Sequence, residues 1–188
     1  GLRNRFAEAK AKGDVKLARI YVSTTYAILG MIFTLVWVAF IIANQFIDWS
    51  RLLNVSESLR PDVTKLAVIV FTYFCISFVF RIITTILLAD QFPAKSSLID
   101  LFGQIIALVI IIILVKTTEG SLVKLGLTFC SSPLVVLIGA NFIFFNGKYK
   151  QYSPSLSFVR FSYAKDLLNL GVKFFIIQLA AIIQYQTA

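Results

Sequence analysis

The sequence predicts an all-α protein, a polytopic transmembrane bundle of about five spans, and three observations support this class. Of the 188 residues, 59% are hydrophobic and only 14% are charged, against roughly 25% charged in an ordinary soluble domain. The mean hydropathy is +0.86, and a chain of this size cannot hide so much apolar surface in a core. The apolar runs are long and smooth, whereas barrel strands alternate over about ten residues, so helices are expected.

The opening residues, 1–20, are polar and basic and are expected to form a helical segment outside the membrane. Ala, Lys, Arg and Glu favour helix. Gly13 suits the end of one helix and Asp14 suits the N-cap of the next. The second helix is then expected to run straight into the first span, at 21–46.

Three further spans are expected at about 65–89, 98–115 and 122–145, separated by polar loops. The chain opens on Gly and its last apolar run has no polar flank, which predicts an internal fragment of a larger membrane protein. The expected organisation is a cytoplasmic helical loop at 1–20, four transmembrane helices of a first bundle at 21–145, a cytoplasmic linker with an amphipathic helix at 146–170, and the start of the next transmembrane helix at 171–188.

The linker contains a pattern, at 155–170, that predicts an amphipathic helix lying at the membrane surface. On an ideal helix its apolar residues form one stripe, and polar residues cover the remaining surface. Both a simple connector and a hinge between two helical bundles fit this pattern. The apolar residues of the stripe are Leu156, Val159, Tyr163, Leu167 and Leu170.

Lys and Arg outnumber Asp and Glu by 18 to 9. In a soluble protein this excess would suggest nucleic acid, but here the basic residues lie between apolar runs, so no nucleic-acid partner is expected. With five spans, the side that holds residues 1–20 carries 12 Lys and Arg, the other side carries 5, and Arg81 is the remaining one. Cytoplasmic loops are enriched in Lys and Arg, so residues 1–20 are expected to be cytoplasmic and to meet membrane lipid.

Arg81 lies inside the second span, about 12 Å before its end at 1.5 Å per residue. Placing Arg there costs about 2.5–3.5 kcal/mol on insertion scales, so it needs a compensating environment. Ser77, Thr84 and Thr85 lie at helical spacing from it, which predicts a polar stripe that faces the bundle interior or a water-filled cavity. Either Arg81 binds a substrate phosphate through its fixed donor fork, or it is structural and reaches the interface or a neighbouring helix.

Neutral polar residues also occur in or near the spans. Interhelical hydrogen bonding is the favoured interpretation, and contact with the hydroxyl groups of a substrate in a cavity is the alternative, for which Gln178 is the candidate substrate-binding residue. The residues in question are Gln104, Asn141, Gln178, Gln184 and Gln186.

Several kinds of chemistry find no support in the residues. There is no His, and Cys75 and Cys130 lie far apart inside apolar runs, which does not suit a zinc site. No carboxylate falls at mid-membrane, Asp100 being the nearest, and no GxxxxGK[ST] loop is present. The residues therefore do not predict an enzyme, and no metal, no cofactor and no catalytic residue is expected.

Three stretches resemble a known family, the bacterial polysaccharide and O-antigen flippases of the Wzx type. These belong to the superfamily that also contains the multidrug and toxin extrusion transporters. The resemblance covers nearly the whole chain and includes no short diagnostic motif. The stretches read GLRNRFAEAKAKGDVKLARIYVSTTYA, RIITTILLADQFPAKSSLID and LLNLGVKFFIIQLAAIIQYQT.

The resemblance implies two six-helix bundles around a central cavity, of which this chain would match helices three to seven. It implies a place in the bacterial cytoplasmic membrane, and transport of an undecaprenyl-pyrophosphate-linked oligosaccharide by alternating access. Other polysaccharide assembly proteins are then expected partners. A small-molecule exporter of the same superfamily, an integral-membrane enzyme of glycan assembly and a membrane scaffold remain as alternatives.

Overall fold

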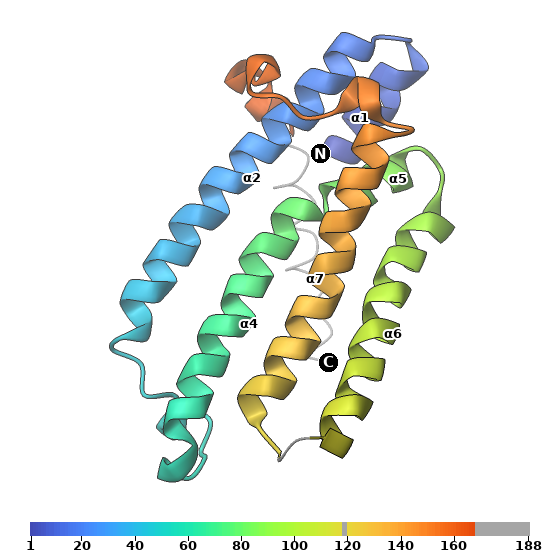
Figure 1. Cartoon of the computed structure of the whole chain (residues 1–188). Helices are drawn as coiled ribbons and strands as arrows, with labels where there is room; N and C mark the ends of the chain where they lie inside the picture. Colours follow the sequence, from blue (N-terminus) through green and yellow to red (C-terminus); the bar gives the residue numbers. More distant parts are fainter. Residues whose placement is uncertain (118–119, 168–188) are drawn as a thin grey trace, which may run out of the picture.

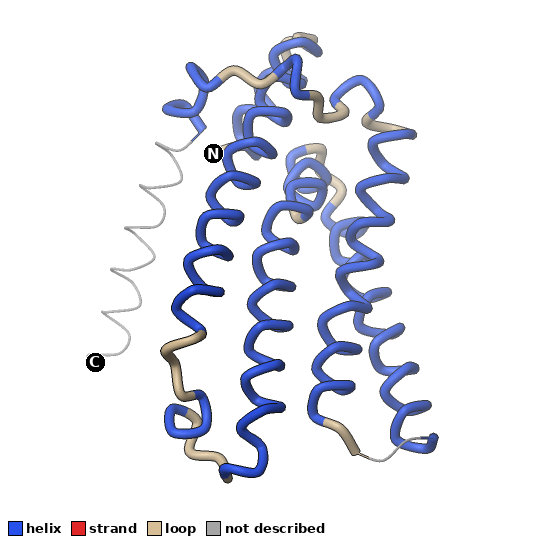
Figure 2. Tube along the Cα trace, turned by 60° about the vertical axis from the view of Figure 1, so that its left-hand side comes forward, coloured by secondary structure: helices blue, strands red, loops and turns tan. Residues whose placement is uncertain are grey.

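A computed structural model describes residues 1–117 and 120–167 of the chain, and the described residues are built from helices (Figures 1 and 2). Four helical segments are long and apolar enough to cross a membrane, which is the architecture of a multi-pass membrane protein. The α-helices are α1 (Leu2–Ala11), α2 (Val15–Asn44), α3 (Trp49–Leu52), α4 (Arg60–Phe80), α5 (Ile82–Ala89), α6 (Pro93–Thr117) and α7 (Leu122–Asn146). Short 3-10 turns are η1 (Glu57–Leu59), η2 (Lys150–Tyr152), η3 (Leu156–Phe158) and η4 (Phe161–Tyr163).

The four spans are α2, α4 continued by α5, α6 and α7. Helix α4 packs between α2 and α7, and α7 packs between α4 and α6 (Figure 1). Their outer faces are apolar, since Leu35 of α2, Val115 of α6 and Phe142 of α7 are each more than 70% exposed. Such surface is unfavourable in water, so lipid is the solvent that suits it. The prediction of a helical membrane bundle is confirmed for four spans, and the expected fifth, at 171–188, lies outside the described residues.

The described segments gather at two ends of the bundle. Helix α1, the turn between α5 and α6 and the segment after α7 lie at one end, which we call the basic end (Figure 1). The α2–α4 connection, the last turn of α6 and the first turn of α7 lie at the opposite end (Figure 2). The sequence predicts these same segments on the two sides of the membrane, with 12 Lys and Arg on one side and 5 on the other.

The break between α1 and α2 falls at Gly13 and Asp14, as the sequence predicts. Gly13 has a φ of +72°, a backbone conformation that glycine adopts without strain. The Asp14 carboxylate accepts a hydrogen bond from the Leu17 N–H at 2.9 Å and so caps α2. Helix α1 then packs against the bundle, where Phe6 is fully buried and meets the Tyr152 ring edge-on at 5.1 Å.

The prediction of an amphipathic helix at 155–170 is wrong for the first half of that segment. Residues 155–163 form η3 and η4, separated by extended backbone at Val159 and Arg160. Side chains of α2 bind two N–H groups of this segment: Ser23 Oγ accepts from Ser155 N at 3.1 Å, and Thr24 Oγ1 accepts from Arg160 N at 3.0 Å. In a helix beginning at 155, the Arg160 N–H would bind the Leu156 carbonyl instead. Only 164–167 are helical, and the rest of the predicted helix lies outside the described residues.

Helix α7 lies close against α6 at Gly103, and a Gly103→Ala variant is expected to be destabilised. A Cβ there would lie 2.7 Å from Pro133 Cα, a backbone atom that cannot move aside. Overpacking of this kind costs about 1–3 kcal/mol. Thermal unfolding of the purified chain in detergent measures the effect. Gly139→Ala in α7 is the control, because no neighbouring atom of the described residues lies within 4 Å of its Cβ position. Equal losses in both variants would contradict the contact as the cause.

Candidate functional site

The second span is interrupted at Arg81, the joint between α4 and α5. Two side-chain donors reach carbonyls at this joint: Asn141 Nδ2 donates to Phe80 O at 2.9 Å, and Thr84 Oγ1 donates to Arg81 O at 2.7 Å. A side chain that inserts into the helical hydrogen-bond ladder bends or breaks it. The break in the second span is therefore explained by two side chains, Thr84, close to Arg81 in sequence, and Asn141 of α7.

Asn141 is buried and joins three of the four spans. Its amide group donates to Phe80 O of α4 and, at 2.8 Å, to Leu137 O of its own helix. Its Oδ1 accepts a 2.5 Å hydrogen bond from the Tyr26 hydroxyl of α2. Every hydrogen-bonding atom of the Asn141 side chain is thus used between or within helices, which confirms the interhelical interpretation for this residue.

The Arg81 guanidinium is paired with a carboxylate of the neighbouring helix. Arg81 Nη2 donates to Asp100 Oδ1 of α6 at 3.0 Å, and the side chains are 49% and 41% exposed. Within the described part of the chain, Nε and Nη1 of Arg81 have no hydrogen-bond partner. The compensating environment that the sequence predicts for Arg81 is therefore one half-exposed acid, and several of its donors stay open.

The predicted polar stripe around Arg81 does not form one continuous surface. Ser77 and Thr84 are buried, whereas the side chain of Arg81 is exposed. Thr84 and Thr85 both direct their hydroxyls to the Arg81 carbonyl, Thr85 at 3.5 Å. Helical hydrogen bonds still join Arg81 N to Ser77 O at 2.8 Å and Thr85 N to Arg81 O at 3.2 Å, so the difference lies in burial, with Ser77 and Thr84 covered by the bundle. Gln178, the remaining candidate, lies outside the described residues.

A second charged cluster lies at the basic end, around Asp90 in the turn after α5. The Asp90 carboxylate forms ion pairs with Lys10 of α1 and with Lys148 of the segment after α7, the latter at 2.8 Å. It also accepts a 2.8 Å hydrogen bond from the Tyr149 hydroxyl. The Asp90 side chain is only 9% exposed, so one buried carboxylate connects three segments that are distant in sequence.

Two aromatic residues, Phe92 and Tyr149, also belong to the cluster around Asp90. The Lys148 ammonium lies 3.6 Å from the centre of the Phe92 ring, a favourable cation–π distance. Burial, with a smaller effect of Tyr152, raises the pKa of Tyr149 to about 12. Tyr149 is therefore protonated at physiological pH and remains a hydrogen-bond donor to Asp90.

The sequence prediction missed both acids as partners. Asp100 was expected only as the carboxylate nearest to mid-membrane, and Asp90 only as part of a loop. The sequence does contain information that could have paired Asp100 with Arg81. The two residues lie at similar distances along the sequence on either side of the turn at Asp90. Antiparallel helices joined by that turn place the two residues at similar depth. For Asp90 the signal is weaker: it is the only acid in the loop at 90–97.

Comparisons with known proteins give no relative for this chain: no protein-family model, no curated protein and no solved structure matches it. In the parts of the chain described, no three His, Cys, Asp or Glu residues are grouped so that they could hold a metal ion. The two cysteines, Cys75 and Cys130, are buried and unpaired with each other, as expected for small apolar residues.

Proposed function

We propose that this chain is part of a transporter that moves an anionic lipid-linked oligosaccharide outward across a bacterial cytoplasmic membrane. The cargo class is an undecaprenyl-pyrophosphate-linked repeat unit, and the transport step is alternating access between two helical bundles. This proposal combines the four apolar spans with the resemblance of the sequence to polysaccharide flippases. Proteins that make or polymerise the same glycan are the expected partners.

One observation carries the proposal, the open guanidinium of Arg81 at a break within a span. An intramembrane Arg is costly and generally marks an ion or substrate pathway. Its open donors suit phosphate oxygens, which Arg binds through two parallel hydrogen bonds.

Asp100 supplies the counter-charge in the absence of cargo. Its ion pair with Arg81 is half-exposed and uses one donor of the guanidinium, so part of the donor fork can be reached by a ligand. A pyrophosphate can therefore compete with Asp100 for the guanidinium. In this proposal the pair holds Arg81 in place between transport cycles, and the cargo takes over part of its donor fork.

Depletion of the gene product in cells that assemble a lipid-linked glycan tests the function. We expect lipid-linked repeat units to accumulate on the cytoplasmic face while surface glycan falls. Lipid extraction and analysis of the glycan after radiolabelling measure both quantities. Normal surface glycan with no accumulated intermediate would contradict the proposal, and a block before the lipid-linked unit is formed would indicate an enzyme of glycan assembly.

A second candidate function, export of a small apolar molecule, has its own observation. A pocket of about 390 Å³ lies between α2 and α4. Its lining is aromatic and apolar, with Phe33, Trp37 and Phe80 among its residues, and Trp37 Nε1 donates to Thr72 Oγ1 at 2.9 Å. Apolar pockets with few polar groups suit drug-sized ligands. Resistance of producing cells to hydrophobic dyes, without any change in surface glycan, would favour this function.

A further inference from the structure

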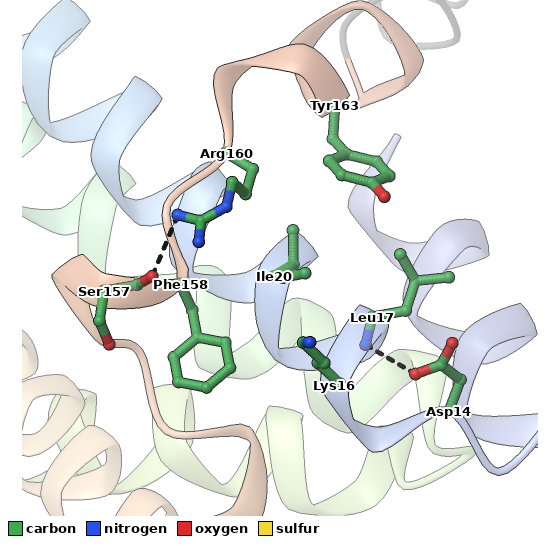
Figure 3. A pocket seen from close by; sticks show the side chains of 8 residues that line it. All are labelled: Asp14, Lys16, Leu17, Ile20, Ser157, Phe158, Arg160 and Tyr163. Carbon is green, nitrogen blue, oxygen red and sulfur yellow. Dashed lines mark hydrogen bonds between the residues drawn. The ribbon is translucent and has the colours of Figure 1, made fainter.

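A pocket of about 610 Å³ lies at the basic end, between the first turns of α2 and the segment at 157–163. Figure 3 shows Lys16 and Leu17 on the α2 wall, and Ser157, Phe158 and Arg160 on the opposite wall. The pocket is separate from Arg81 and from the α2–α4 pocket, since it shares no residue with either. The proposed transport function assigns it no role.

The wall that carries Arg160 is held firmly against α2. Arg19 Nε donates to Ser153 O at 2.9 Å, and the guanidinium of Arg19 lies 4.3 Å from the centre of the Phe158 ring. Thr24 Oγ1 accepts from Arg160 N at 3.0 Å and donates to Arg160 O at 3.4 Å. The backbone of Arg160 is thus fixed on both sides, so the pocket is formed before any ligand arrives, and binding needs little ordering.

Two cations face this pocket from its two walls. Among the residues that the structure describes, the Lys16 ammonium has no hydrogen-bond or ion-pair partner. Arg160 Nη1 donates to the carbonyls of Ser157 and Val159, at 3.1 and 2.9 Å, and no other described residue binds Nε or Nη2. Asp14 also lines the pocket, but its carboxylate caps α2. The charged lining residues therefore carry a net charge of about +1.

The level of the pocket along α2 suits a lipid headgroup. Lys16 lies in the first turn of a helix whose later residues form an apolar span, so the pocket lies where that span leaves the membrane. Leu17, Ile20 and Phe158 supply apolar surface beside the two cations. Charge together with apolar surface at this level matches a phosphate group attached to a glycerol backbone and acyl chains.

We propose that this pocket binds the phosphate of an anionic phospholipid, with Lys16 and Arg160 as its two cationic contacts. The lipid then joins α2 to the segment after α7 at the surface of the membrane. The same phosphate chemistry occurs in a free anion, and the apolar wall is the feature that distinguishes the lipid. The inference requires only that the basic end faces a leaflet containing anionic lipid, and it does not depend on the cargo.

The test is binding of short-chain phosphatidylglycerol to the purified full chain in an uncharged detergent, read by native mass spectrometry. We expect saturable binding of one molecule, weakened about 30-fold in the Lys16→Gln/Arg160→Gln variant, since each basic contact at a membrane surface accounts for about a fivefold effect. The charge-retaining Lys16→Arg/Arg160→Lys variant is expected to bind within about threefold of the wild type, which separates loss of charge from misfolding.

The control variant is Lys12→Gln/Lys150→Gln, which removes the same charge from the same end outside the pocket. Unchanged binding by this variant supports the proposal, and an equal loss overturns it because the charge would then act from anywhere on this end. Equally tight binding of short-chain phosphatidylcholine also overturns it. Displacement of the lipid by inorganic phosphate at a similar concentration assigns the pocket to a free anion and overturns the lipid proposal.

Discussion

Arg81→Ala is expected to reduce glycan export to background, by at least about 30-fold, while the protein remains in the membrane. Removing one partner of a charged hydrogen-bonded contact away from water costs about 2–5 kcal/mol, and on the proposed function that contact is made to the pyrophosphate. Surface glycan in cells that depend on the variant measures export, and an immunoblot of the membrane fraction normalises it. Arg81→Lys keeps the charge but loses the donor fork, so an intermediate rate is expected. Normal export at normal expression by Arg81→Ala would end the substrate role.

Asp100→Asn separates the substrate role of Arg81 from a structural one. If Arg81 serves only as the ion-pair partner of α6, then Asp100→Asn removes the charge from the same 3.0 Å contact and reproduces the loss of export. If Arg81 binds the cargo, Asp100→Asn leaves the guanidinium in place and removes its competitor. We therefore expect export by Asp100→Asn to stay within about fivefold of the wild type, which corresponds to about 1 kcal/mol, because the guanidinium keeps its donors for the cargo.

The spans were predictable because their signal is contained in the local sequence. A run such as IIALVIIIILV in α6 has one stable form in lipid, a helix that satisfies its own backbone. The cap at Asp14 was predictable for the same reason, since the side chain and the N–H it accepts from are three residues apart. The grouping of basic segments at one end then follows from the alternation of spans.

The candidate site was less predictable because its contacts join distant parts of the chain. The break at Arg81 depends on Asn141, which is 61 residues from its acceptor Phe80. Residues 155–163 depart from the predicted helix because Ser23 and Thr24, over 130 residues earlier, bind their N–H groups. A helical pattern in one segment contains no information about donors and acceptors that a different helix supplies, so helical spacing alone predicted a helix and a stripe that the fold does not form.

Asp90→Asn is expected to release α1 from the basic end and to lower the unfolding free energy by about 2–3 kcal/mol. The carboxylate is nearly buried between Lys10 and Lys148, so its loss leaves two ammonium groups near each other with no neutralising acid. Breaking a buried ion pair costs about 3–5 kcal/mol, and the partial exposure of both lysines reduces that figure. Thermal unfolding in detergent measures the stability, and trypsin cleavage within α1 reports its release.

Glu8→Gln is the matched control for Asp90→Asn. Glu8 is also a carboxylate between two cations of the basic end, with Arg5 at 3.2 Å and Lys12 at 2.7 Å, but it is exposed to solvent. Water screens such pairs, so the melting temperature and the trypsin pattern are expected to stay as in the wild type. The two variants remove the same charge and differ in burial and in the segments joined. An equal effect of both would show that the general charge balance holds α1 in place, whereas an effect confined to Asp90→Asn identifies the buried carboxylate as the group that joins α1, the α5–α6 turn and the segment after α7.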